Sequence, residues 1–160
     1  MKPLFLAQIG RQLFAVDKEN VVGVGVRNDD TIKPVVENGR AYLPLPHGNR
    51  AVICDLQTLM TRNGGLLPSK RGYYLIVAHE ENLMALTMSG KGRIIMADVA
   101  AARPLPPAFA RKSRVLIPGV LVNCTDLILL VDLQALLGAT DGEASLGVAR
   151  ADNERPAREY

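Results

Sequence analysis

Two aspartates could support chemistry in this chain, because each follows an apolar run and precedes Leu-Gln. They are Asp55 and Asp132. Carboxylates from two related β halves could face each other and share one proton, as in an aspartic protease. That chemistry uses Asp-Thr-Gly or Asp-Ser-Gly, in which small residues let neighbouring hydroxyl and N–H groups hold the carboxylates. Because a bulky leucine and a glutamine follow both aspartates here, we favour helix capping, in which each carboxylate accepts hydrogen bonds from the first N–H groups of a helix.

The other reactive side chains are isolated from one another. His47 and His79 are the only imidazoles, and no further ligand stands near either at the spacing of a metal site. The segment 89–92 superficially resembles a phosphate-binding loop but lacks its full spacing and a following helix, so we expect a hairpin turn. Cys54 and Cys124 are expected to lie inside apolar strands as core thiols in a reducing compartment. We therefore expect no catalytic residue, no metal site and no cofactor.

Both aspartates belong to a segment that occurs twice. Residues 52–60 read VICDLQTLM, and residues 129–137 read LLVDLQALL. In each copy an apolar strand leads to the aspartate, and the apolar residues that follow fall on one face of a helix. We interpret the chain as two copies of one unit.

The segments before the first aspartate are typical of short strands joined by tight turns. Residues 4–9 and 12–16 flank a Gly-Arg turn and predict a hairpin. The β-branched run at 21–26 contains two glycines, which indicate bulges or a sharp bend. Asn-Gly within 35–42 is the strongest hairpin signal of the chain. A loop is expected at 44–50.

The second half repeats this pattern after a polar segment. A turn is expected at 80–82, and the proline-rich residues 103–114 are expected to be extended. The strands expected in this half lie at 75–78, 83–88, 115–122 and 127–131. The small, polar and charged residues at 139–160 predict a disordered tail.

These elements predict a mainly β fold of two small antiparallel, SH3-like β-barrel subdomains packed together, with short helices after Asp55 and Asp132. We expect a single domain over residues 1–138. Its first barrel is expected at about 3–60 and its second at about 73–137. Each barrel would have about five strands.

Composition narrows the classes of function. The chain has 160 residues, of which 48% are hydrophobic and 22% charged, as in an ordinary globular protein. Its net charge of +3 is spread among interleaved acids, and with 4% aromatic residues it offers few stacking platforms, so we expect no nucleic-acid partner. No apolar run is long enough to span a membrane, and the N-terminus lacks a complete secretion signal, which together predict a cytoplasmic protein without membrane insertion.

With no catalytic site expected, the chain is most simply a protein-binding module, and one alternative stays open. A small β-barrel protein associated with nucleic acid or ribosomes would fit the calculated pI of about 9.0. That function requires a continuous basic face. The cations that could form one are Arg62, Lys70 and Arg71, or Arg111, Lys112 and Arg114.

Four segments occur in an order that resembles a known family. They are QLFAVDKENVVGV at 12–24, LPLPHGNRAVICDL at 43–56, ARPLPPAF at 102–109 and DLILLVDLQALLG at 126–138. The second segment places Gly48 seven residues before Asp55. These features are similar to those of the CheW-like family, the bacterial chemotaxis coupling proteins, and the resemblance covers residues 3 to 138.

The resemblance implies a non-enzymatic adaptor that couples a histidine kinase to receptors. The regulatory domain of the kinase would meet the adaptor barrel to barrel, and the signalling tips of chemoreceptors would dock in the groove between the barrels. By their positions in the family pattern, six residues are expected to contact partners: Val21, Gly23, His47, Gly48, Asn49 and Arg50.

The chain also departs from the family pattern. Leu45-Pro46-His47 replaces the family's Asn-Leu-Arg, Gly23 replaces an acid, and Met88-Ser89 replaces a Val-Asp pair. The family arginine at position 47 is associated with partner binding. An arginine is always charged and can form paired hydrogen bonds to a carboxylate, whereas an imidazole is mostly neutral near pH 7. We therefore expect this chain to bind receptor tips weakly.

Overall fold

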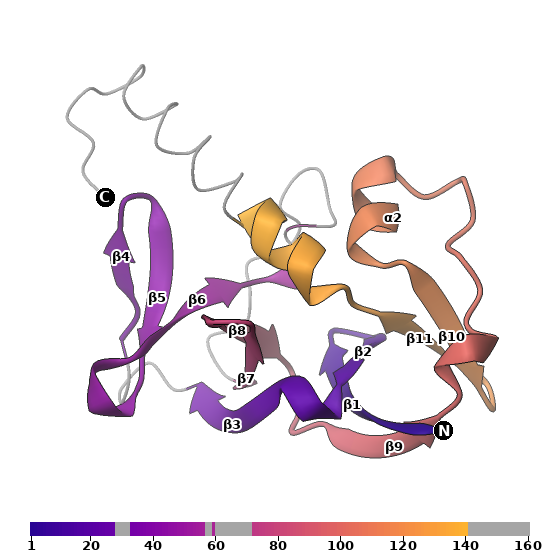
Figure 1. Cartoon of the computed structure of the whole chain (residues 1–160), viewed down its shortest axis with the longest axis horizontal. Coiled ribbons are helices and arrows are strands. Elements are labelled where there is room, and N and C mark those ends of the chain that lie inside the picture. The colour runs from indigo at the N-terminus through magenta and orange to yellow at the C-terminus, as the bar shows by residue number, and fades with distance from the viewer. Residues whose placement is uncertain (28–32, 57–58, 60–71, 141–160) are drawn as a thin grey trace.

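A computed structural model of the chain describes residues 1–27, 33–56, 59 and 72–140 (Figure 1). Within these residues the fold is mainly β and consists of two sheets with short helices, as predicted. The expected disordered tail lies outside the described residues, apart from positions 139 and 140, which are helical. None of the helices in the described part of the chain has the length and apolar composition needed to cross a bilayer.

Sheet A has five strands in the order β10-β11-β2-β1-β9. Their bounds are β1 Lys2–Ile9, β2 Gln12–Asp17, β9 Arg93–Ala97, β10 Gly119–Asn123 and β11 Asp126–Leu130. The β1–β2 hairpin is confirmed, and its turn contains Gly10 with φ +64°. Strand β9 follows the turn expected at 89–92, but it pairs antiparallel with β1 rather than with the preceding strand. An ion pair between Lys2 and Asp17 joins β1 to the end of β2, and the hydrogen bond within it raises the pKa of Lys2.

Sheet B has six strands in the order β3-β7-β8-β6-β5-β4. Their bounds are β3 Val21–Arg27, β4 Val35–Glu37, β5 Arg40–Pro44, β6 Arg50–Cys54, β7 Gly72–His79 and β8 Asn82–Met88. The bulge expected in β3 is confirmed by a register shift between Val21 and Gly23. Asn38 and Gly39 form the expected two-residue turn between β4 and β5, with φ values of +54° and +78° that suit a hairpin of this kind.

The two halves of the chain exchange strands. Strand β6, which leads to Asp55, pairs in parallel with β8 of the second half, and β11, which leads to Asp132, pairs in parallel with β2 of the first half. The sheets therefore do not coincide with the barrel boundaries expected at about 3–60 and 73–137. Adjacent residues determine a hairpin, whereas the partners of β6 and β11 lie far away in the sequence, so the repeat alone did not reveal the exchange.

The buried apolar residues form three clusters. A small cluster within sheet A contains Leu6 and Ile128, and another within sheet B contains Leu43 and Tyr74. The largest cluster lies between the sheets and includes Phe14 of β2 with residues of β7 and β8. Strands β1 and β8 are buried on both faces over most of their length, because each borders two of these clusters.

Helices follow both aspartates, as predicted. Residues 133–140 are helical, and one carboxylate oxygen of Asp132 accepts hydrogen bonds from the N–H groups of Gln134 at 3.0 Å and Ala135 at 3.2 Å. This confirms the cap at Asp132. At the first copy, the N–H group of Leu59 donates to the carbonyl of Asp55 at 3.0 Å, as in a helical turn. The residues that the Asp55 carboxylate would cap lie outside the described residues.

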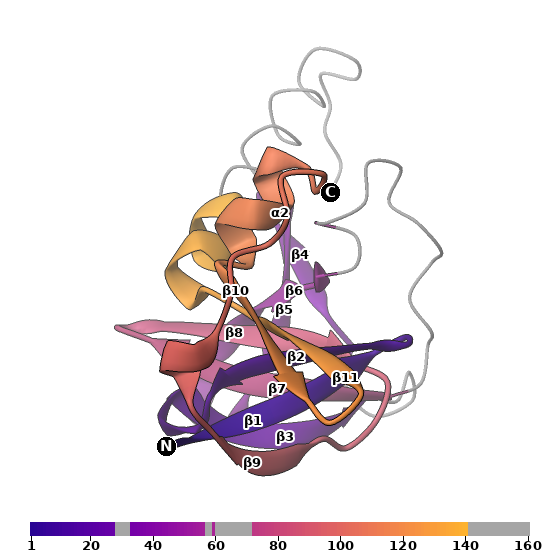
Figure 2. The same cartoon turned by 90° about the vertical axis from the view of Figure 1, so that its right-hand side faces the viewer.

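The segment 103–122 differs from the expectation of an extended stretch followed by a strand. Helix α2 spans Arg111–Leu116, and β10 begins only at Gly119. Prolines 107 and 118 bracket the helix, and residues 108–117 between them contain no proline that would hold them extended. Burial of Ser113 and Leu116 on one side stabilises the helix against the core. Figures 1 and 2 show α2 beside the helix at 133–140.

Three smaller expectations were wrong. Cys54 is buried as expected, but Cys124 is exposed in the β10–β11 turn with φ +58°. The turn between β7 and β8 has two residues, since Asn82 already pairs with His79. Residues 89–92 do not form a hairpin turn, because they connect β8 of sheet B to β9 of sheet A.

Three short 3₁₀ helices complete the described structure: η1 Lys18–Asn20, η2 Pro46–Gly48 and η3 Val99–Ala101. Two of them begin with an aspartate cap. Asp17 accepts from the N–H group of Glu19 at 3.2 Å, and Asp98 accepts from the N–H group of Ala100 at 3.1 Å. Asp17 is the last residue of β2 and Asp98 directly follows β9, so each cap begins a helical turn where a strand ends.

Candidate partner-binding surface

Strand β3 forms one edge of sheet B and exposes a row of valines. Alternate residues of a strand point to opposite faces, and here Val22, Val24 and Val26 are 63%, 45% and 62% exposed. The opposite row contains Val21, which packs against the main core, and Gly23, which lies at the bulge. An exposed apolar row on a sheet edge is uncommon in a protein that acts alone, because it can pair with another chain.

A second exposed apolar edge occurs on sheet A. Strand β9 lies at the edge of that sheet and exposes Ile94 and Met96 at 52% and 56%. It occupies the corresponding place in the repeat, because β3 pairs with the first strand of the second hairpin and β9 pairs with the first strand of the first hairpin. Figures 1 and 2 both show β3 and β9 along the lower side of the molecule.

The loop at 46–49 has a strained backbone. His47 has φ +65° and Gly48 has φ +77°, and the N–H group of Leu45 closes the loop by donating to the carbonyl of Asn49 at 2.8 Å. A left-handed conformation costs a residue with a side chain about 1 kcal/mol. His47, Gly48 and Asn49 are all exposed, so the loop presents an imidazole and an amide side chain to solvent.

Arg50 is engaged within the protein. Its guanidinium donates to the carboxylate of Glu37 at 2.5 Å and lies 3.9 Å from the ring centroid of Tyr42. The hydrogen bond with Glu37 raises the pKa of Arg50 above its ordinary value. Any partner contact through Arg50 would therefore compete with two interactions that already orient its side chain.

The residues expected to contact partners form two surfaces. Val21 and Gly23 lie on β3, whereas His47, Gly48, Asn49 and Arg50 lie between β5 and β6 or at the start of β6. Strands β7 and β8 separate β3 from β6 in sheet B. The sequence pattern identified strand β3 but not its exposed valine row, because strand periodicity favours burial of the larger side chains.

Among the described residues, the structure does not bring together side chains for the aspartate-pair or metal-binding chemistry considered above. Asp55 follows a strand of sheet B, and Asp132 follows a strand of sheet A. No group of three or more His, Cys, Asp or Glu side chains that could hold a metal ion occurs among the described residues. The Nε2 atom of His79 is buried without a hydrogen-bond partner, and the imidazole belongs to the end of β7 rather than to a cluster.

Comparison with known proteins places the fold. No protein-family model matches the chain, and no curated protein matches its sequence. Among solved structures, the scaffolding protein TtCheW from Thermoanaerobacter tengcongensis matches with a TM-score of 0.64 at 18% sequence identity. The match covers 82% of this chain and 84% of that chain. The resemblance inferred from four sequence segments is thus confirmed at the level of the fold, and the protein has a CheW-like fold.

Proposed function

We propose that this protein is a non-enzymatic adaptor of a bacterial chemotaxis-type pathway and couples a histidine kinase to receptors. The observation that carries the proposal is its CheW-like fold, which it shares with a scaffolding protein at a TM-score of 0.64. Scaffolds act by binding, and the exposed apolar edge of β3 supplies a surface suited to that task.

The valine row of β3 is the surface we assign to the regulatory domain of the kinase. Full burial of a valine contributes about 1.5–3 kcal/mol, so three half-exposed valines can supply several kcal/mol on association. The unpaired side of the edge strand adds backbone hydrogen bonds if the partner presents a strand of its own. A barrel-type partner has such strands, which fits the barrel-to-barrel contact that the resemblance implies.

Receptor tips are assigned to the loop at 46–49, and we expect that contact to be weak. The family arginine at position 47 is a histidine here. A hydrogen bond to a charged group contributes about 1.5–3 kcal/mol, so its loss weakens binding by roughly ten- to a hundredfold. Arg50 does not replace it, because its guanidinium is held by Glu37 and Tyr42.

Calorimetric titrations of the full chain test both assignments. We expect a barrel-type kinase regulatory domain to bind and a receptor signalling tip to bind much more weakly. His47→Arg should strengthen receptor binding by at least roughly tenfold. Absence of kinase-domain binding at tens of micromolar would defeat the adaptor proposal. Tight receptor binding that survives His47→Ala would defeat the argument from the missing arginine.

The nucleic-acid alternative is not proposed. One of its two candidate basic groups, at 62–71, lies outside the described residues. The other lies on the six-residue helix α2, where Arg111 and Arg114 are exposed beside the equally exposed, apolar Val115. A single short helix does not form the continuous basic face that the alternative requires.

A further inference from the structure

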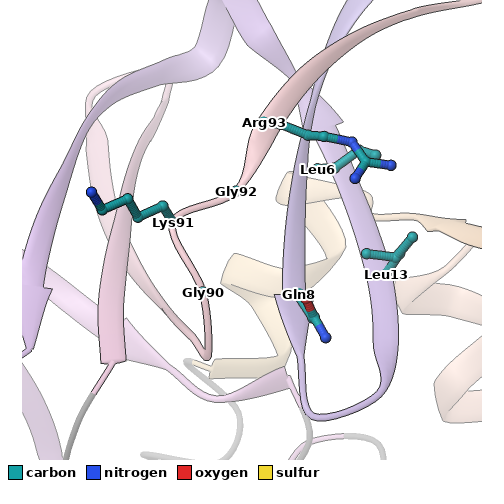
Figure 3. A pocket seen from close by; sticks show the side chains of 7 residues that line it. All are labelled: Leu6, Gln8, Leu13, Gly90, Lys91, Gly92 and Arg93. Carbon is teal, nitrogen blue, oxygen red and sulfur yellow. The ribbon is translucent and has the colours of Figure 1, made fainter.

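A small cavity opens at one end of sheet A. Its volume is about 240 Å³, and it lies between the ends of β1 and β2 and the loop that leads into β9 (Figure 3). Leu6 and Leu13 form its apolar part, and the residues Lys91 and Arg93 also line it. No acidic residue lines it. The cavity is distinct from β3 and from the loop at 46–49.

Strand register explains why a charge stands here. Arg93 pairs with Leu6, and Ile95 pairs with Leu4, so Arg93 continues the row of β9 that faces the interior of sheet A. The other members of this row, Ile95 and Ala97, pack against the apolar cluster of the sheet. Arg93 therefore stands at the open end of this row, where the residue is exposed to solvent, next to an apolar interior.

Figure 3 shows the orientation of these side chains. Those of Arg93, Leu6 and Leu13 lie on the same side of β1, and in this view the Arg93 guanidinium is drawn beside Leu6. The side chain of Lys91 extends in the opposite direction. Within the described part of the chain, Arg93 forms no ion pair or side-chain hydrogen bond, and Asp126, at the same end of β11, is not bonded to it.

The wall beside β9 is held in place before any ligand arrives. The N–H group of Ser89 donates to the carbonyl of Gln8 at 2.7 Å, and the Ser89 hydroxyl accepts from the N–H group of Gly10 at 2.9 Å. Gly92 has φ +80°, and a Cβ atom there would lie 2.5 Å from Phe5 and 2.6 Å from the carbonyl oxygen of Leu6. A side chain at position 92 would therefore clash with β1.

We propose that this cavity is a binding site for a carboxylate that carries a short aliphatic group. The guanidinium of Arg93 would bind the carboxylate through paired hydrogen bonds, and Leu6 and Leu13 would contact the aliphatic group. The volume is below that of sites for drug-sized ligands and suits a small one. Two sources present this chemistry, a free short-chain acid and the C-terminal aliphatic residue of a polypeptide.

A simpler explanation of Arg93 predicts different behaviour. Inward-facing charges protect edge strands from pairing with other chains. In that case the guanidinium would remain in water and would not select an amphipathic anion. A ligand with both a charge and an aliphatic body distinguishes the two explanations.

The test uses the ¹⁵N-labelled full chain and isovalerate as the probe. We expect saturable amide shifts confined to residues near Leu6, Leu13 and the loop at 89–93, with millimolar affinity. Isovaleramide, which lacks the charge, and acetate, which lacks the aliphatic body, should each bind at least roughly tenfold more weakly. N-acetylvaline represents a polypeptide C-terminus, and its binding relative to isovalerate separates the two sources. Equal binding of acetate and isovalerate would mean an adventitious anion contact only and would overturn the proposal.

Variants locate the interaction. Arg93→Gln should weaken isovalerate binding by roughly ten- to a hundredfold, and Arg93→Lys should restore part of it. Leu13→Phe should block the cavity while leaving the guanidinium in place. Arg111→Gln removes an exposed arginine from α2 and should have no effect. Unchanged binding in Arg93→Gln, with a spectrum that shows an intact fold, would overturn the proposal.

Discussion

The two edge strands β3 and β9 occupy the same place in the repeat but differ in the residues on their outer and inner rows. Both present apolar side chains on the outer face. The inner row of β9 begins with the charged Arg93, and the inner row of β3 ends with the charged Arg27. The inner row of β3 has Gly23 and Gly25, and neither glycine has an atom within 4 Å of the position a Cβ would take. Strand β3 exposes three valines whereas β9 exposes two large apolar side chains, and β3 is the edge that we assign to a partner.

The largest effect should come from a charge on the exposed row of β3. Val24→Lys would place an unpaired ammonium within the proposed contact, so we expect binding of the kinase regulatory domain to fall by roughly a hundredfold or more. Met96→Lys makes the matched change on β9 and should change the affinity less than about threefold. Calorimetry of both variants decides the comparison. Equal losses would show that the two edges contribute alike.

Gly92→Ala should destabilise the protein where the loop before β9 meets β1. The new Cβ would clash with Phe5 and the carbonyl of Leu6 at a residue whose φ is +80°, so unfolding free energy should fall by about 2–4 kcal/mol. Gly90→Ala is the control, because no atom lies within 4 Å of its Cβ position. Urea denaturation measures both. A Gly92→Ala protein as stable as the control would mean that the loop can move away from β1.

Asp132→Ala separates stability from binding. Loss of the two hydrogen bonds that cap the helix at 133–140 should cost about 1 kcal/mol. Because the helix buries Leu133 and Leu136 in the core between the sheets, the loss should affect both edges equally. Kinase-domain affinity should remain unchanged. A parallel fall in affinity would show that binding depends on overall stability rather than on β3.

The smallest effect should follow Gly25→Ala in β3. A methyl group has open space there, and alanine is better suited than glycine to a regular strand, so the stability should change by no more than about 0.5 kcal/mol. Thermal unfolding provides the measurement. A loss of 2 kcal/mol or more would show that this glycine is required by the bend of the strand, which would weaken the interpretation of β3 as a simple open edge.

Sequence reasoning succeeded where neighbouring residues determine the structure. The β1–β2 hairpin, the Asn38-Gly39 turn and the cap at Asp132 all depend on contacts within a few residues, and all were predicted. The helix at Arg111–Leu116 was missed because the prolines before it suggested extended chain, while its stability comes from burial of Leu116 against distant elements. The strand exchange was missed for the same reason.

The candidate surfaces were harder to predict from the sequence for a different reason. Periodicity favours burial of the larger side chains, yet in β3 the valine row is exposed and the glycine row faces inward. A departure of this kind is expected where a surface serves a partner. The position of Arg93 could have been noticed in the sequence, because it lies two residues before Ile95 and therefore on the same row of the strand. Its meaning depended on knowing that β9 pairs with β1, which the sequence pattern did not indicate.

The exchange of β6 and β11 between the halves also has a consequence during synthesis. Strand β6 leaves the ribosome well before its partner β8, so the first half must wait with an unpaired strand until the second hairpin emerges. Strand β2 waits still longer for β11. Pairings between such distant segments slow folding, because a long loop must close before they form. We therefore expect that neither half folds alone, and that a gene split between β6 and β7 yields folded protein only when both fragments are produced together.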